Sequence, residues 1–335
     1  MMSSIQASLK KTALDARSDL LMGRGGLTNI VDHRFPDPLK FGPMFAISVA
    51  LFGQTVMDRV ISRPDGRPSL PLGVSVVILT NALVFFKPGG VSSAAVSLSP
   101  HRVIERHEFG RLIRSSLVHV DFQHFILNMR SVLEFGAQLE EFVPPVSLLA
   151  DVASLTVVSQ SMYVGFAWAE YKFFGVTSAY YDTRIVGFSA VGFALQVIAG
   201  YLHDGELADD QDSLYIPPQY LCWLSLIASQ VFFPGTSFQG HFCGILSGLL
   251  RVFVPRPFLW VRRRFVKLFR GLTGRRVVDN ERDEVVIRRR RGAKNLLWHT
   301  VWGLVSFGIL TALKVQGAGR GSTTLTGKCP NVLRG

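Results

Sequence analysis

The sequence predicts an all-α protein, a polytopic transmembrane helical bundle. Of the 335 residues, 48% are hydrophobic and only 18% are charged, whereas soluble domains carry about 25% charged residues. Six apolar windows are long enough to cross a bilayer as helices. The formal net charge is +12, and much of the cationic excess lies between residues 251 and 294, directly after the last window. Lys and Arg accumulate in cytosolic segments next to a transmembrane helix, so we expect this charge to face a membrane surface and no nucleic acid.

The six windows define the predicted core, residues 71–255. Breaks rich in Pro or Gly at 88–90, 144–145 and 217–218 mark loops between windows. The windows cover residues 71–86, 117–135, 146–168, 185–202, 216–233 and 238–254.

Two further apolar runs leave the number of membrane crossings open. Residues 44–57 end at Asp58 and Arg59, so they form either a span or an interfacial helix packed on the bundle. Residues 296–313 are long enough to cross, but Lys314 would then lie on the non-cytosolic side, against the positive-inside rule. The flanking parts are a flexible N-terminal extension (1–42), an extra helix and linker (43–70), a basic cytosolic tail (256–295), the extra helix at 296–313 and a C-terminal tail (314–335).

The basic tail fixes the orientation of the segments. With this tail in the cytosol, the sixth segment ends at the cytosolic face, so the second, fourth and sixth segments all begin at the opposite face. The first turns of the fourth and sixth segments therefore lie in one leaflet. Polar residues inside transmembrane segments are costly and usually mark a functional site, and these three segments carry them.

A serine and a histidine open the fourth and sixth segments. The fourth reads Val-Gly-Phe-Ser189-Ala, and the sixth reads Gln-Gly-His241-Phe-Cys-Gly. A serine hydroxyl is a weak nucleophile that needs an adjacent base, and imidazole has a suitable pKa. Glycines repeat at every fourth position of the sixth segment from Gly240, which favours close approach of the two helices. We therefore predict Ser189 as the nucleophile and His241 as the general base, with Phe193 stacked on the imidazole.

The second segment supplies a pair of hydrogen-bond donors. His124 and Asn128 are four residues apart, so they differ by only about 40° around a helix. Amide and imidazole N–H groups stabilise a developing oxyanion when they are fixed in place beforehand. We predict that both side chains form the oxyanion site together with the backbone N–H groups that begin the fourth segment.

No acidic third member is predicted, and no metal or organic cofactor is required. Asp182 lies in a loop seven residues before Ser189, and Asp121 lies near the entry of the second segment. The three cysteines, at positions 222, 243 and 329, lack the spacing of a metal site and are interpreted as packing residues. The prediction is a Ser-His dyad.

Together the three motifs resemble the rhomboid family. Its pattern is His-x4-His-x3-Asn on the second core helix, Gly-x-Ser on the fourth and Gly-His-x-x-Gly-x-x-x-Gly on the sixth, and all three occur in order here. The resemblance covers roughly residues 71–254 and implies a rhomboid-like six-helix core. It also implies that Ser189 and His241 form the catalytic dyad, and that His124 and Asn128 form the oxyanion site.

The chain departs from the family pattern at three positions. Gly110 precedes Arg111 where rhomboids usually have Trp-Arg, Ala190 follows the serine where a glycine is frequent, and Phe193 replaces a common tyrosine. Residues 185–197 and 222–248 are most similar to the endoplasmic-reticulum subgroup, which implies a multi-pass integral protein of that membrane, with another endomembrane or organelle membrane as the alternative.

The resemblance implies an intramembrane serine endopeptidase that cleaves transmembrane segments of membrane proteins. Its implied partners are transmembrane protein substrates, the lipid bilayer and, through the arginine run at 288–291, the ubiquitin and AAA-ATPase degradation machinery. The alternative is a catalytically inactive rhomboid-like protein that binds clients in membrane-protein quality control, although an intact Ser/His pair argues against it. A third interpretation, a small transporter built around polar intramembrane residues, requires solute flux that survives the loss of Ser189.

Overall fold

The structure is a computed structural model that describes residues 43–61, 71–87, 93–202, 217–233, 235–275, 277, 282–283, 287 and 295–306. Within these residues the fold is a bundle of helices, with one isolated antiparallel β-bridge between Leu98 and Ile185. The all-α prediction is confirmed. The predicted extension at 1–42 and tail at 314–335 lie outside the described residues.

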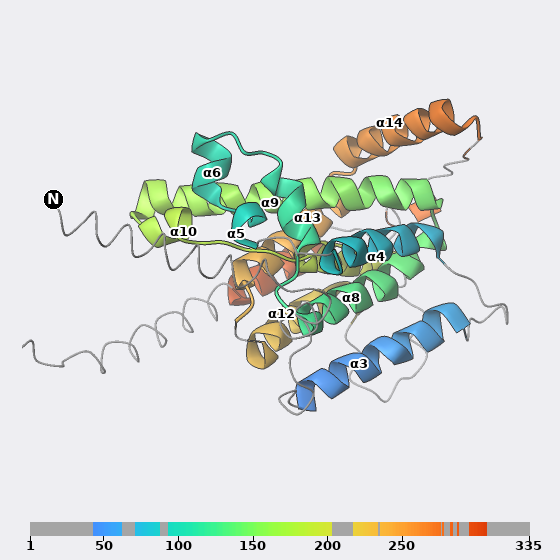
Figure 1. The fold of residues 1–335 in the computed structure, drawn as a ribbon, viewed down its shortest axis with the longest axis horizontal. Helices are drawn as coiled ribbons and strands as arrows, with labels where there is room; N and C mark the ends of the chain where they lie inside the picture. Colours follow the sequence, from blue (N-terminus) through green and yellow to red (C-terminus); the bar gives the residue numbers. More distant parts are fainter. Residues whose placement is uncertain are drawn as a thin grey trace, which may run out of the picture.

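Each of the six predicted core segments contains a helix (Figure 1). These are α4 (Leu72–Phe85), α8 (Phe122–Glu140), α9 (Pro145–Phe174), α11 (Ser189–Leu202), α12 (Leu221–Phe232) and α13 (Phe238–Phe253). The other elements are α3 (Pro43–Val56), the π-helix η2 (Met57–Ile61), α5 (Ser93–Val96), α6 (Pro100–Glu105), α7 (Arg111–Leu117), α10 (Thr177–Tyr181), the 3-10 helix η3 (Pro218–Tyr220) and α14 (Arg256–Thr273).

Helices α8 and α11 begin four or five residues later than the apolar windows that predict them. Helix α8 starts at Phe122 because Asp121 caps it: the carboxylate accepts a hydrogen bond of 2.7 Å from the backbone N–H of His124. Helix α11 starts at Ser189, because the residues just before it form backbone hydrogen bonds with the first loop, the connection between α4 and α8 that contains α5, α6 and α7. Apolar composition therefore predicts that these helices exist, and local capping sets where they begin.

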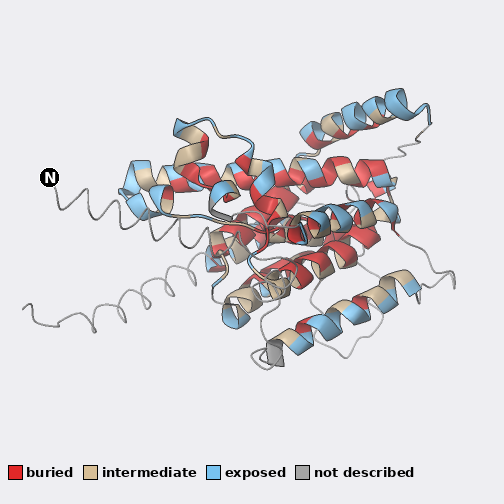
Figure 2. Cartoon of the chain, viewed as in Figure 1, coloured by how far each residue is buried: buried red, intermediate tan, exposed pale blue. Residues whose placement is uncertain are grey.

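Helix α11 is the centre of the bundle. It packs against α8, α9 and α13, and it is buried on nearly every side, including Val191, Leu195 and Ile198. Figure 2 shows buried residues along the inner helices, whereas exposed residues are frequent on outer helices such as α3, α4 and α14. The outer helix α4 exposes Leu79 and Leu83, as expected where a helix faces lipid.

The described helices differ in whether they are long and apolar enough to cross a bilayer. Among the described helices, α9 alone is long and apolar enough to cross on its own, and α13 with α14 qualifies only as a pair bent by 84°. Helices α4 and α11 are apolar but shorter. The membrane crossing of each individual segment therefore stays a prediction.

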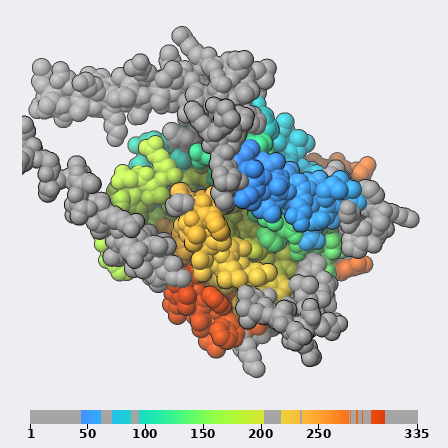
Figure 3. Space-filling view, turned by 90° about the horizontal axis from the view of Figure 1, so that it is seen from below, coloured from blue at the N-terminus to red at the C-terminus, as the bar shows by residue number. Residues whose placement is uncertain are grey.

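Both flanking apolar runs form helices that pack on the core (Figure 3). Helix α3 packs on α8, and Arg59 of η2 forms an ion pair of 2.6 Å with Glu134 of α8. Residues 295–306 are helical, and their His299 joins α11 to α12: Trp223 Nε1 donates to His299 Nδ1 at 3.0 Å, and Tyr201 Oη lies 3.1 Å from His299 Nε2. Residues 307–313, the rest of the predicted extra span, lie outside the described residues.

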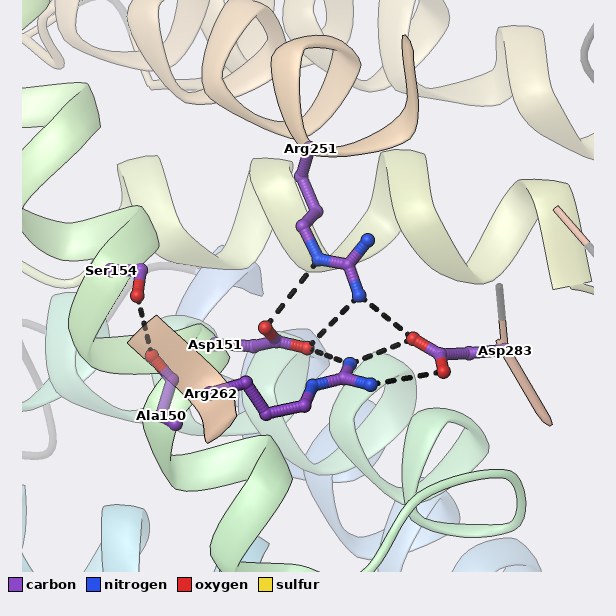
Figure 4. Close-up of polar contacts among 6 residues, drawn as sticks. All are labelled: Ala150, Asp151, Ser154, Arg251, Arg262 and Asp283. Carbon is purple, nitrogen blue, oxygen red and sulfur yellow. Dashed lines mark hydrogen bonds and ion pairs between the residues drawn. The ribbon is translucent and has the colours of Figure 1, made fainter. Parts of the chain in front are cut away.

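Part of the predicted basic tail is folded onto the core. Helix α14 packs on α9, and a buried cluster of four charges holds it there (Figure 4). Arg262 of α14 pairs with Asp151 of α9 and bonds to Asp283 at 2.7 Å and 3.0 Å. Arg251 at the end of α13 bonds to Asp283 at 2.8 Å and to Asp151 at 3.4 Å. All four side chains are at most 4% exposed, so each charge depends on the others for compensation.

Candidate active site

The first loop positions the segment that leads into α11. Leu98 and Ile185 exchange backbone hydrogen bonds of 2.9 Å and 3.3 Å, and the N–H of Gly187 donates to the carbonyl of Ser115 at 3.0 Å. Gly187 adopts φ +115°, a conformation that favours glycine. These contacts fix the chain immediately before Ser189, which is the first residue of α11.

The first turns of α11 and α13 lie side by side and run parallel. A Cβ added at Gly240 would lie 3.6 Å from Ile185 Cδ1, one added at Gly244 would overlap the carbonyl of Ala190, and one added at Gly248 would lie 2.8 Å from the carbonyl of Ala194. The contacts advance along both helices in the same direction. The prediction that repeated glycines allow close approach of these helices is confirmed.

His241 lies within this contact, between Gly240 and Gly244, and is 5% exposed. The ring of Phe193, one turn after Ser189, lies 4.7 Å from the imidazole between centroids at an interplanar angle of 31°. The predicted contact between the Phe193 ring and the imidazole is therefore confirmed, and the two rings are tilted relative to each other. Among the hydrogen bonds of the described residues, none joins Ser189 to His241; the ring instead pairs through Nδ1 with Ser229 Oγ at 3.2 Å.

The hydrogen bonds of Ser229 in α12 favour one tautomer of His241. Its hydroxyl donates its single proton to the carbonyl of Leu226 at 2.7 Å, so its oxygen is left to accept from His241. Nδ1 then carries the imidazole proton, and Nε2 carries the lone pair that a general base requires. Sequence reasoning missed this residue. Its position as a polar side chain inside a transmembrane window was a usable signal, but such serines commonly bond their own helix backbone, as Ser229 also does.

The two predicted oxyanion residues meet at the entry to α11. A Cβ added at Gly187 would lie 2.5 Å from His124 Cε1 and 3.4 Å from Asn128 Nδ2, so both side chains face the backbone two residues before Ser189. Asn128 is 5% exposed, and its Nδ2 is buried without a hydrogen-bond partner among the residues that the structure describes. A buried donor without a partner costs free energy. This cost is expected if the Asn128 amide is kept ready for an oxyanion that exists only during the reaction.

The remaining residues considered from the sequence take structural positions. Asp121 caps α8, and Asp182 is exposed at the end of α10. Cys222 and Cys243 are buried free thiols, and Cys329 lies outside the described residues. His119 packs edge-on against His124, with ring centroids 5.3 Å apart.

Arg111 anchors the first loop, which contacts the segment before Ser189. It is 4% exposed and donates to the carbonyl of Ser97 at 2.8 Å and to Glu108. The hydrogen bond and charge of Arg111 hold the pKa of Glu108 below its ordinary value. The chain therefore has the buried arginine of the family pattern, but Gly110 precedes it in place of a tryptophan.

Comparison with known proteins identifies the domain. Residues 106–257 match the rhomboid domain. Rhomboid-like protein 14, mitochondrial, of Arabidopsis thaliana is 31% identical over 55% of this chain and 56% of its own length. Human Rhomboid-related protein 4 is 31% identical over 46% of this chain and 48% of its own. Rhomboid-type serine protease 2 of Debaryomyces hansenii is 27% identical over 55% of this chain and 63% of its own.

The chain spans about half the length of the first two relatives. No solved structure is significantly similar to it. The matched range contains α8, α11 and α13, the three helices that bring the serine, the histidines and the asparagine together. Residues 106–257 of this chain are therefore identified as a rhomboid domain, similar to those of rhomboid-like and rhomboid-related proteins.

Proposed function

We propose that this protein is an intramembrane serine endopeptidase in which Ser189 is the nucleophile and His241 the general base. The observation that carries the proposal is the parallel contact between the first turns of α11 and α13, with the Phe193 ring on the His241 imidazole. This contact supports a shared site, because Ser189 opens α11 and His241 lies in the first turn of α13, and donors that are fixed beforehand stabilise developing charge effectively.

The chemistry follows from the hydrogen bonds of the imidazole. Ser189 Oγ attacks the carbonyl carbon of a substrate peptide bond while its proton passes to Nε2 of His241, the nitrogen left unprotonated by the Ser229 contact. The imidazolium then protonates the leaving amine as the C–N bond breaks. Water attacks the acyl-enzyme with His241 again as base, which releases the acid and restores the serine.

The oxyanion formed in each step needs donors near Ser189. Asn128 Nδ2 and the His124 ring support this role because both lie against Gly187, and the Ser189 N–H begins a helix, where backbone donors lack intrahelical acceptors. Hydrogen bonds between catalytic groups often form only in the substrate complex. The mechanism therefore requires the Ser189 hydroxyl to close onto Nε2 when substrate binds.

A fluorophosphonate probe on the purified full chain tests the enzyme proposal, since it labels an activated serine covalently. We expect labelling of the parent and none of Ser189→Ala or His241→Ala. A transmembrane reporter substrate should be cleaved by the parent, and Asn128→Ala should lower kcat by about a hundredfold or more, the usual effect of removing one oxyanion donor. A parent that neither labels nor cleaves, yet still binds membrane-protein clients, would instead support the inactive client-binding alternative.

Substrates, partners and organelle remain part of the proposal. The inferred substrates are transmembrane helices with glycine or other helix-breaking residues, because a peptide bond inside an intact helix is shielded from attack. The arginine run at 288–291, proposed to contact the ubiquitin and AAA-ATPase machinery, lies outside the described residues. We propose the endoplasmic-reticulum membrane as the location; the Arabidopsis relative is named mitochondrial, so co-localisation of a tagged full chain with markers of both organelles discriminates between them.

A further inference from the structure

Helix α14 presents two distinct exposed stripes beside the face that packs on the core. Phe258, Arg262 and Val266 are buried against the bundle. Successive residues advance by about 100° around a helix, so two neighbouring stripes can be assigned from the sequence of α14. The exposed apolar stripe contains Phe265, Leu268 and Leu272, and the exposed cationic stripe contains Arg264, Lys267 and Arg270.

The apolar stripe is too exposed for a surface that faces water. Leu268 is 60% exposed and Leu272 78% exposed, and apolar surface of this kind is stable only when something covers it. A helix with an apolar stripe bordered by Lys and Arg is typical of helices that lie in the membrane interface. Trp260, whose ring lies 5.2 Å from the guanidinium carbon of Arg264, is a residue type enriched at the same depth.

The position of α14 relative to the bundle fits an in-plane orientation. Helix α13 ends at Phe253, α14 begins at Arg256, and the two axes are bent by 84°. A helix that leaves a transmembrane helix at nearly a right angle runs along the membrane surface. The buried charges around Arg262 fix it there (Figure 4), and α14 lies at the edge of the bundle next to α9 (Figure 1).

We propose that α14 is an interfacial helix that binds the anionic cytosolic leaflet of the bilayer. Phe265, Leu268 and Leu272 insert at the level of the upper acyl chains, and Arg264, Lys267 and Arg270 contact anionic lipid headgroups. This inference rests on the membrane location of the rhomboid family and is independent of protease activity, so it can fail or hold separately from the proposed function.

The depth of the apolar stripe is tested with single labels on the full chain in lipid nanodiscs. Leu268→Cys and Gly271→Cys place an environment-sensitive fluorophore on the apolar stripe and on the cationic side, with Cys329→Ser in every variant; Cys222 and Cys243 are buried. A Cβ at Gly271 meets no atom within 4 Å, so the control label is tolerated. We expect the label at 268 to be shielded from an aqueous quencher and the label at 271 to be quenched.

The charge requirement is tested by titrating short-chain phosphatidylserine into the same Leu268→Cys protein in detergent and following the label. Each Lys or Arg near an anionic surface contributes about fivefold in affinity, so Arg264→Gln, Lys267→Gln and Arg270→Gln combined should raise the apparent Kd by roughly a hundredfold. Short-chain phosphatidylcholine should have no such effect. A matched variant with Arg106→Gln and Arg114→Gln, two exposed cations of the first loop, should behave as the parent.

Three results would overturn the inference. Equal quenching at 268 and 271 in nanodiscs would show that the apolar stripe does not face lipid. An unchanged phosphatidylserine Kd in the triple variant, with a parent-like size-exclusion profile, would remove the cations from the interaction. Shielding at 268 that requires added cytosolic protein would assign the stripe to a protein partner.

Discussion

Substituting Gly244 by alanine tests the helix contact on which the candidate site depends. The added Cβ would overlap the Ala190 carbonyl and lie 2.8 Å from Ala190 Cα. Both neighbours are backbone atoms, which cannot rotate away, so α11 and α13 must separate by about 1 Å to restore van der Waals contact. Overpacking of this kind destabilises a fold by about 1–3 kcal/mol. A displacement of about 1 Å between reacting groups lowers a rate by roughly a hundredfold.

The assays are thermal unfolding of the detergent-solubilised full chain and cleavage of a transmembrane reporter. Gly165→Ala on α9 is the matched control, because a Cβ there meets no atom within 4 Å. We expect Gly165→Ala to match the parent in activity and to equal or slightly exceed it in stability, because alanine favours a helix over glycine, and we expect Gly244→Ala to lose stability and activity together. If Gly244→Ala unfolds and cleaves like Gly165→Ala, the close approach of the two helices is refuted.

Three further predictions concern single side chains. Ser229→Ala should lower kcat by about five- to tenfold with little change in KM, since one hydrogen bond to His241 is lost, and Ser229→Thr should restore the rate; an unaffected kcat in Ser229→Ala would exclude a positioning role. Asp283→Asn should destabilise the fold by about 3 kcal/mol, because buried arginines lose a charged partner, and an unchanged unfolding temperature would contradict this. Arg111 lowers the pKa of the Glu108 carboxyl in the folded protein. The ion pair therefore stabilises the fold fully at any pH above the ordinary glutamate pKa of about 4.3. This stabilisation is lost as the pH falls through the lower pKa that Glu108 has in the folded state. Hydrogen exchange of the first loop should follow that loss in the parent, and an identical pH profile in Glu108→Gln would rule out the pair as its cause.

The parts of the site that could be predicted from the sequence are those set by helix periodicity. Glycines four residues apart predict a close helix contact, and the spacing of His124 and Asn128 predicts a shared face; both are confirmed at Ala190 and Gly187. The position of Phe193 one turn after Ser189 likewise predicts its contact with His241. These predictions need only the geometry of one helix and the knowledge that two helices are neighbours.

The parts that could not be predicted depend on how distant segments meet. Ser229 reaches His241 only because α12 lies beside α13, and no spacing within either helix encodes this contact. Arg251 is paired with Asp151, 100 residues earlier, and with Asp283, 32 residues later. The sequence showed a basic tail, whereas the buried face of α14 and its ion pairs make this segment part of the fold.

The histidine that joins residues 295–306 to α11 and α12 limits how far the protein can be trimmed for biochemical work. Cutting at the end of the family-matched range, residue 257, would remove the acceptor of the Trp223 indole and the neighbour of the Tyr201 hydroxyl, both of which are buried. It would also remove Arg262 and Asp283 from the charge cluster, so that Arg251 would keep one carboxylate partner, Asp151. Expression of the isolated rhomboid domain should therefore extend to residue 306, well past the end of the matched range.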